Sequence, residues 1–170
     1  QAHLIAANID QAVLIVTVVE PSTSLGFIDR FLVTCESFRI PALLVFNKSD
    51  LFSEATQEYY EAVSELYEEI GYDTLLTSII SKQGIIELKE KLSNKTSLIA
   101  GHSGTGKSSL INTMYPEKEL KIGEISTTHQ KGKHTTTFAE MFPLGNKTFV
   151  IDSPGIKELG LFDLDSEMLS

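Results

Sequence analysis

The chain has 170 residues, 42% hydrophobic and 22% charged, which is the composition of an ordinary soluble domain with its own core. Its net charge of −9 excludes strong nucleic-acid binding by bulk electrostatics, so an RNA partner would need a local basic patch or another domain. Its single cysteine, Cys35, excludes an internal disulfide and a zinc cluster, and we expect a buried thiol. The longest apolar run is too short to cross a membrane, and we expect a cytoplasmic protein.

Two continuous apolar runs, at residues 12–19 and 42–46, predict strands covered on both faces. Pro21 ends the first run, and Asn47 follows the second directly. Between the runs, apolar residues at helical spacing predict a helix that Pro41 stops. The expected buried face of that helix consists of Ile28, Phe31, Leu32 and Cys35.

A second helix is predicted between Ser53, which is a plausible N-cap, and Gly71, which closes it. Its expected apolar stripe consists of Tyr59, Ala62, Val63, Leu66, Tyr67 and Ile70. Six glutamates on the same helix indicate a solvated face rather than a metal site: Glu54, Glu58, Glu61, Glu65, Glu68 and Glu69. A short strand at 73–78 and a helix marked by Ile85, Leu88 and Leu92 come next.

The second half predicts a buried strand at 97–100, a glycine-rich loop and a helix. Residues 116–137 show no clear period, and a long segment of this kind is usually functional. Two strands, at 138–144 and 147–151, flank a turn at Gly145-Asn146, and a loop with a short helix follows to residue 170. Strands alternating with helices predict an α/β fold with a mostly parallel sheet between two helical layers, and ligands bind at the carboxyl ends of such strands.

The glycine-rich loop fits the phosphate-loop pattern of Gly, four residues, Gly-Lys-Ser. Its backbone N–H groups can wrap a phosphate at the start of the following helix, where Lys107 reaches the β- and γ-phosphates and the Ser108 hydroxyl binds Mg²⁺. The expected nucleotide-binding residues here are Gly101, His102, Ser103, Gly104, Thr105, Gly106, Lys107, Ser108 and Ser109. We expect the His102 side chain itself to be incidental, because backbone groups provide the binding.

Asn47-Lys48-Ser49-Asp50 resembles the guanine-recognition motif of GTPases. The Asp50 carboxylate can accept hydrogen bonds from guanine N1–H and the 2-amino group, which adenine does not offer in that geometry. Ser78-Ile79, followed by Lys82-Gln83-Gly84, resembles the second base-contacting loop of those proteins, where the Ile79 N–H could reach guanine O6.

Asp152-Ser153-Pro154-Gly155 resembles the Asp-x-x-Gly motif of GTPases. Asp152 would hold Mg²⁺ through a water molecule, and the Gly155 N–H would sense the γ-phosphate. One hydroxyl among three consecutive threonines should complete the Mg²⁺ shell, and we favour Thr136 over Thr135.

The motifs come in a circularly permuted order, because Asn47 precedes Gly101 by 54 residues instead of following the phosphate loop. This order strongly resembles the RsgA (YjeQ) family of bacterial GTPases that act in small-subunit ribosome assembly. Three segments add to the resemblance: Ile5-Ala6-Ala7-Asn8-Ile9-Asp10-Gln11, Gly132-Lys133-His134-Thr135-Thr136-Thr137 and Asp152-Ser153-Pro154-Gly155-Ile156.

The resemblance implies that residues 1–170 form a circularly permuted, three-layer P-loop GTPase domain that hydrolyses GTP to GDP and phosphate with Mg²⁺. It implies that the full-length protein also has an N-terminal OB-fold that binds RNA and a C-terminal zinc domain, which holds the only Zn²⁺. The 30S subunit and 16S rRNA would be partners largely through those domains, with no membrane partner, and we expect a monomer.

The attacking water needs a group to position it, and Ile156 stands where Ras-like enzymes have a glutamine. The domain alone should therefore be slow and stimulated by the small subunit. His134 is the best internal candidate for this role, so the expected catalytic residues are His134, Lys107 and Thr136.

Three alternative functions remain open on the sequence. A permuted GTPase of large-subunit assembly shares the chemistry, but the switch around His134 and the opening segment disfavour it. The Asn47-Lys48-Ser49-Asp50 motif disfavours a P-loop ATPase or kinase. Intact Lys107, Ser108 and Asp152 disfavour a catalytically silent scaffold.

Overall fold

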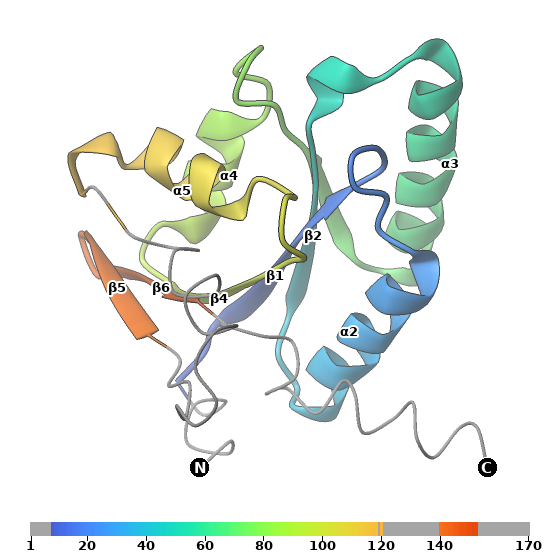
Figure 1. Cartoon of the computed structure of the whole chain (residues 1–170). Coiled ribbons are helices and arrows are strands. Elements are labelled where there is room, and N and C mark those ends of the chain that lie inside the picture. The colour runs from blue at the N-terminus through green and yellow to red at the C-terminus, as the bar shows by residue number, and fades with distance from the viewer. Residues whose placement is uncertain (1–7, 119, 121–139, 153–170) are drawn as a thin grey trace, which may run out of the picture.

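A six-stranded sheet with helices on both faces organises the chain in the computed structural model, which describes residues 8–118, 120 and 140–152 (Figure 1). The strands, in the spatial order β3-β2-β1-β4-β6-β5, are β1 (Gln11–Thr17), β2 (Ala42–Asn47), β3 (Asp73–Leu76), β4 (Thr96–Ala100), β5 (Glu140–Gly145) and β6 (Thr148–Asp152). The helices are α2 (Leu25–Ser37), α3 (Glu54–Ile70), α4 (Ile85–Leu92) and α5 (Lys107–Met114), with 3-10 turns η1 (Ser49–Leu51) and η2 (Pro116–Lys118). The predicted α/β class is confirmed.

All the strand pairs are parallel except β5 with β6, so five strands end at the same edge of the sheet. Thr17 at the end of β1 lies beside Asn47 at the end of β2. On the other side of the sheet's centre, Ile99 of β4 pairs with Asp152 of β6. The register thus brings residues that are far apart in the sequence to one edge.

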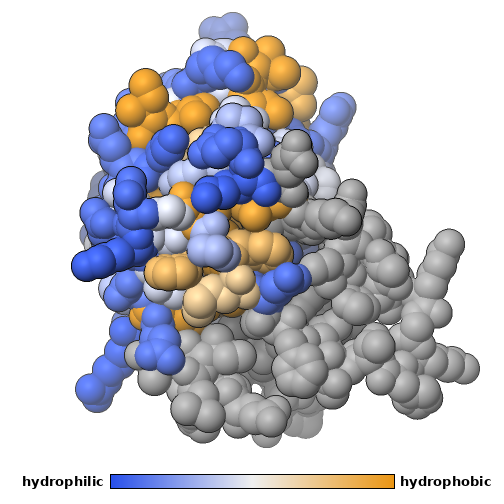
Figure 2. All heavy atoms as spheres, turned by 90° about the vertical axis from the view of Figure 1, so that its left-hand side faces the viewer, coloured by the Kyte–Doolittle hydropathy of each residue, from blue (hydrophilic) through white to orange (hydrophobic). Residues whose placement is uncertain are grey.

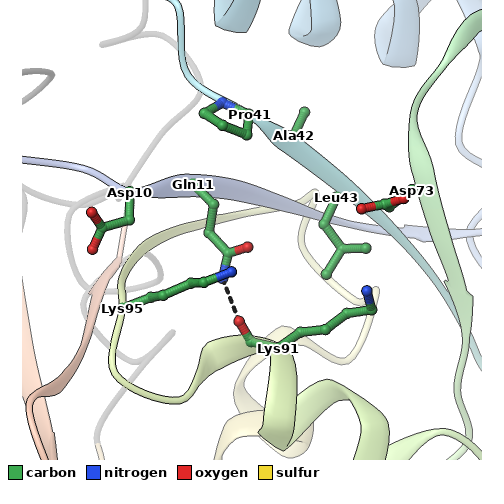
Figure 3. A pocket seen from close by; sticks show the side chains of 8 residues that line it. All are labelled: Asp10, Gln11, Pro41, Ala42, Leu43, Asp73, Lys91 and Lys95. Carbon is green, nitrogen blue, oxygen red and sulfur yellow. Dashed lines mark hydrogen bonds between the residues drawn. The ribbon is translucent and has the colours of Figure 1, made fainter.

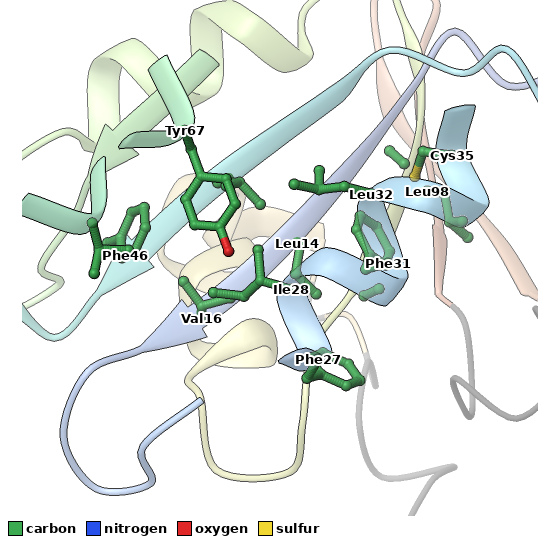
Figure 4. Packing of buried hydrophobic residues seen from close by; sticks show 14 of the residues in the cluster. Leu14, Val16, Phe27, Ile28, Phe31, Leu32, Cys35, Phe46, Tyr67 and Leu98 are labelled. Atoms are coloured by element: carbon green, nitrogen blue, oxygen red, sulfur yellow. The ribbon is translucent and has the colours of Figure 1, made fainter. Parts of the chain in front are cut away.

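The core has two parts, one on each face of the sheet, because alternate side chains of each strand point to opposite faces. Leu14 and Val16 of β1 point toward α2 and α3, and Figure 4 shows them with Phe31 and Tyr67 in that layer. Val13 and Ile15 point the other way, toward α4 and α5. The continuous apolar run of β1 is therefore explained by burial on both faces, as predicted.

The predicted helix α2 is confirmed, with Ser24 as its N-cap and all four expected face residues buried. Cys35 is among them, and burial raises the pKa of its thiol to about 12, which makes the thiol unreactive. The Ser53 and Gly71 caps of α3 are also confirmed, the latter in the left-handed conformation.

The predicted apolar stripe of α3 is wrong in part. Val63 and Tyr67 are buried, but Tyr59, Leu66 and Ile70 are 45%, 47% and 63% exposed. Only part of the apolar side of this helix packs against the sheet, and the rest stays exposed. Tyr60, rather than Tyr59, turns inward, and its ring centroid lies 5.2 Å from that of Phe46.

The hairpin of β5 and β6 is confirmed, but its turn is not centred on Gly145-Asn146. Gly145 pairs with Thr148, so the two loop residues are Asn146 and Lys147, both at positive φ. This is the geometry that suits a two-residue hairpin loop. The expected irregular segment at 116–137 and the C-terminal helix lie largely outside the described residues.

The face in Figure 2 is mixed, with hydrophilic side chains among apolar ones that lie at its top and across its middle. In Figure 1 the loop between β3 and α4 lies at the top of the molecule. Ile80 in that loop and Ile86 in the helix after it are each 73% exposed. No helix among the residues described here is long and apolar enough to span a membrane.

Replacing Phe31 tests the α2 layer of the core. Phe31 is 0% exposed, so Phe31→Ala should lower the free energy of unfolding by about 3–5 kcal/mol through lost burial and an unfilled cavity. Val33 on the same helix is 58% exposed, and Val33→Ala should change it by less than about 0.5 kcal/mol. Urea unfolding of both variants measures the difference, and equal losses would contradict this packing.

Candidate functional site

The phosphate-loop motif connects β4 to α5, as its sequence predicts. Gly104 and Gly106 adopt φ values of +87° and +90°, which other residues rarely adopt. A Cβ on Gly101 would lie 2.8 Å from the Ile15 carbonyl oxygen, so this glycine is required by close approach of two backbones. The side chain of Thr105, 0% exposed, turns inward and donates to the His102 carbonyl at 2.9 Å. The loop is therefore held in shape from within.

Asn47 joins the loop to two strand ends. Its side chain is 3% exposed, and its Nδ2 donates to the Thr105 carbonyl at 2.9 Å. Its Oδ1 accepts from the Thr77 hydroxyl at 3.0 Å, just beyond β3. A Cβ on Gly106 would lie only 2.4 Å from Asn47 Nδ2, so the amide needs a glycine opposite it.

Lys48 makes a second bridge across the site. Its backbone is left-handed, with φ of 66°, and its ammonium donates to the carbonyls of Glu20 and Gly104, both at 2.6 Å. Glu20 lies in the loop after β1. Pro21 in the same loop lies close to the phosphate loop, because a Cβ on Gly104 would be 3.6 Å from Pro21 Cδ. The stem of Lys48 therefore spans the edge of the sheet between two loops.

Asp50 is exposed, and one of its carboxylate oxygens is held in place. Oδ1 accepts from the Ser78 hydroxyl at 2.7 Å, and Ser78, 0% exposed, in turn accepts from the N–H groups of Ile80 and Ser81. Ser78 thus orients Asp50 and shapes its own loop. The Ile79 N–H makes no hydrogen bond within the described part of the chain.

Lys107 and Asp152 form an ion pair at the other side of the phosphate loop. The Lys107 ammonium donates to Asp152 Oδ1 at 2.6 Å, with the two side chains 12% and 5% exposed. Asp152 is the last residue of β6, just as Asn47 is the last residue of β2, so the ends of two parallel strands position both side chains. Ser108 follows Lys107 in the first turn of α5 and is half-buried.

His102 has a structural contact that the sequence did not predict. Its ring centroid lies 4.1 Å from that of Phe27 in α2. Burial lowers the pKa of His102, so the neutral imidazole is favoured against the apolar ring. The imidazole thus packs the phosphate loop against α2, and the expectation that backbone groups alone bind the nucleotide here stays a prediction.

His134, Thr136 and Gly155 lie outside the described residues, and so does the rest of the threonine switch. No group of three or more His, Cys, Asp or Glu side chains that could hold a metal occurs in the described ranges. A shallow hollow at the opposite edge of the sheet is lined by residues such as Asp10, Gln11 and Lys91, with Gln11 donating to the Lys91 carbonyl (Figure 3). The hollow contains none of the predicted site residues.

Comparison with known proteins identifies the family. A sequence model described as RsgA GTPase matches residues 1–162. The chain belongs to the RsgA GTPase family. It is 56% identical over 168 residues to the small ribosomal subunit biogenesis GTPase RsgA of Cytophaga hutchinsonii, covering 99% of this chain and 55% of that protein. It is 50% identical over 167 residues to the protein of the same name from Phocaeicola vulgatus, covering 98% and 54%.

Two solved structures share this RsgA-family fold. YjeQ from Thermotoga maritima matches with a TM-score of 0.75 and 38% identity, over 89% of this chain and 50% of that one. YloQ, described as a circularly permuted GTPase, matches with a TM-score of 0.65 and 31% identity, over 92% and 48%. The predicted permuted P-loop GTPase fold is thereby confirmed, and the chain spans about half the length of the relatives it matches.

Sequence reasoning missed several residues that build this RsgA-family site. Thr77 orients the Asn47 amide, and the Glu20 carbonyl holds Lys48. Gln83, which the sequence did place in the second base-contacting loop, accepts from the Ser49 hydroxyl at 2.7 Å and, through its carbonyl, from the Ser78 N–H at 3.0 Å. Only their positions in the sequence could have suggested Thr77 and Glu20. Thr77 directly follows strand β3, and Glu20 precedes Pro21 in the loop after strand β1.

Replacing Gly106 tests the close approach of the Asn47 amide. Gly106→Ala and Gly104→Ala both force alanine into a positive φ, at about 1–2 kcal/mol each. Only the Gly106 variant also meets Asn47 Nδ2, and it should lose about 1–3 kcal/mol more because the Asn47–Thr105 hydrogen bond breaks. Thermal unfolding measures the two variants, and equal melting temperatures would mean that the amide can move aside.

Proposed function

We propose that this chain is the GTPase domain of a protein that hydrolyses GTP to GDP and phosphate during late assembly of the small ribosomal subunit. The observation that carries the proposal is the direct linkage of a base-recognition motif to a phosphate loop. Asn47 and Lys48 each hydrogen-bond a phosphate-loop carbonyl, so a ligand that contacts both ends must match a fixed separation. In a guanine nucleotide, the base would meet the motif at residues 47–50 and the phosphates would meet the phosphate loop.

Guanine selectivity rests on Asp50. Its Oδ1 is occupied by Ser78, while Oδ2 has no hydrogen-bond donor among the residues described. The carboxylate can still accept hydrogen bonds from the two donors on the guanine edge, and an adenine there would leave Oδ2 unpaired at a steep cost. Ser78 acts in this proposal as a positioning residue for Asp50, and the Ile79 N–H is free for guanine O6.

The phosphate end suits a magnesium nucleotide. Mg²⁺ is commonly held by one or two carboxylates together with phosphate oxygens and water, and Asp152 is a buried carboxylate balanced by a flexible cation. Asp152, Ser108 and Thr136 would hold the ion, which would neutralise charge on the phosphates. Lys107 would turn from Asp152 to the β- and γ-phosphates, while the N–H groups from Gly101 to Ser109 cradle them and the Gly155 N–H senses the γ-phosphate.

The names of the relatives support a proposal for the partner of this domain. Proteins named for small ribosomal subunit biogenesis support a 30S partner for this chain, and they disfavour the large-subunit alternative. We propose that the complete protein adds an OB-fold before and a zinc domain after residues 1–170, and that these carry most of the contact with 16S rRNA. The acidic domain itself then acts as a cytoplasmic monomer without a membrane partner.

Asp50→Asn tests the guanine assignment. The amide keeps the shape of the carboxylate but replaces an acceptor with a donor, so GDP affinity should fall at least about a hundredfold and xanthosine diphosphate should bind better than GDP. Asp73→Asn, an exposed acid at the opposite edge of the sheet, should leave GDP affinity unchanged. Calorimetry measures both, and wild-type binding of ADP as tight as GDP would refute guanine selectivity.

His134→Ala tests hydrolysis and its stimulation. Ile156 cannot orient a water molecule, so the domain should be slow alone, and His134 should supply this function when the 30S subunit is bound. In the full-length protein, His134→Ala should keep GDP affinity and lose most 30S-stimulated turnover, roughly the 10²–10⁴-fold of a general base.

Lys107→Ala is the control for the turnover measurement on His134→Ala. It should abolish both basal and stimulated single-turnover hydrolysis, because it removes positive charge from the transition state. Wild-type stimulated turnover in His134→Ala would leave the ribosome as the group that positions water. Unchanged hydrolysis in Lys107→Ala would refute the enzyme assignment itself.

A further inference from the structure

One side of α3 carries an apolar stripe that no other part of the described chain covers. Tyr59, Leu66 and Ile70 are 45%, 47% and 63% exposed. Their spacing of seven and then four residues places them on one side of the helix. Buried Val63 and Tyr67 lie next to this stripe, so it continues the core-facing surface outward instead of being isolated on the solvent side.

The position of the stripe on the molecule follows from two contacts. Glu68 lies on the opposite side of α3, where it accepts from the Thr74 hydroxyl of edge strand β3 at 2.5 Å. The stripe therefore faces away from β3. Tyr67 reaches Asp29 of α2 at 2.7 Å, and Val33, one helical turn beyond Asp29, is 58% exposed. Helix α2 thus adds a fourth exposed apolar side chain to this face of the domain, on which both helices lie in Figure 1.

An acidic row runs parallel to the stripe. Glu58, Glu65 and Glu69 each precede one of its three residues, and all are exposed. The sequence from residue 49 to 81 contains eight acidic residues and no Lys or Arg. The stripe is thus bordered by negative charge, and residues 49–81 offer no basic side chain to neutralise it.

These charges decide what can cover the stripe. A nucleic-acid backbone or an anionic membrane would be repelled. A second copy of this chain using the same face would offer glutamates and no Lys or Arg from residues 49–81, so it would not neutralise the row. A helix with apolar residues at spacings of three and four, flanked by Lys or Arg, matches the stripe and the row together.

We propose that this face of α3 is a docking surface for a basic amphipathic helix of another protein. The placement of that helix rests on the proposed function: on the small ribosomal subunit, α3 faces a basic protein segment and not rRNA. The domain would then contact a ribosomal protein directly through α3, in addition to the rRNA contacts made by the proposed flanking domains.

A synthetic peptide tests the surface without the ribosome. A helical peptide of leucine and lysine at amphipathic spacing should bind the full-length protein in calorimetry, and the same helix with glutamate for lysine should not. The double variant Glu65→Lys with Glu69→Lys should weaken the lysine peptide at least about tenfold. The matched variant Glu87→Lys with Glu90→Lys, on α4, should leave its affinity unchanged. Equal binding by both variants would overturn the proposal.

A photo-crosslinker tests the partner. Benzophenone-alanine in place of Leu66 in the full-length protein, bound to purified 30S subunits with a GTP analogue, should crosslink to a Lys- and Arg-rich segment of a ribosomal protein. The same group in place of Ile86, on the other face, should not reach that segment. Crosslinks from position 66 to rRNA, to another domain of the same protein, or to nothing despite cosedimentation would overturn the placement. Loss of cosedimentation in the wild type would instead overturn the proposed 30S partner, while the peptide still decides the surface.

Discussion

The site depends on one buried side-chain amide. Asn47 uses its donor on the Thr105 carbonyl of the phosphate loop and its acceptor on Thr77 after β3, while it sits at the end of β2. A buried amide left without these partners would cost about 1–3 kcal/mol, so the three segments are stable only in one arrangement. The separation between the base-recognition motif and the phosphate loop is therefore set by the protein before a ligand enters.

The parallel sheet makes this arrangement possible for a permuted chain. Every strand that contributes to the site ends at the same edge, so the order in which the strands occur in the sequence does not change which side chains meet. Permutation moves the base-recognition motif ahead of the phosphate loop and leaves β2, β1 and β4 adjacent.

The two ends of the site are held by different kinds of contact. Five hydrogen bonds join Asn47, Lys48 and Asp50 to neighbouring segments, and two of these bonds end on carbonyls of the phosphate loop. On the other side of the phosphate loop, Lys107 and Asp152 form an ion pair, and both members have further roles in the proposed chemistry. A phosphate group competes for the lysine, so binding there exchanges one partner for another, whereas the base-recognition end only receives its ligand.

The sequence by itself determined the elements and the motifs. Continuous apolar runs identified β1 and β2, Ser53 and Gly71 bounded α3, and the glycine spacing located the phosphate loop, because each is a local signal carried by a few neighbouring residues. Tertiary structure alone decided which apolar residues of α3 are buried, that Asn47 requires Gly106 opposite it, that Lys48 bridges Glu20 and Gly104, and that His102 packs on Phe27. Each of these joins segments distant in the sequence, and only the path of the chain through the sheet brings their atoms into contact.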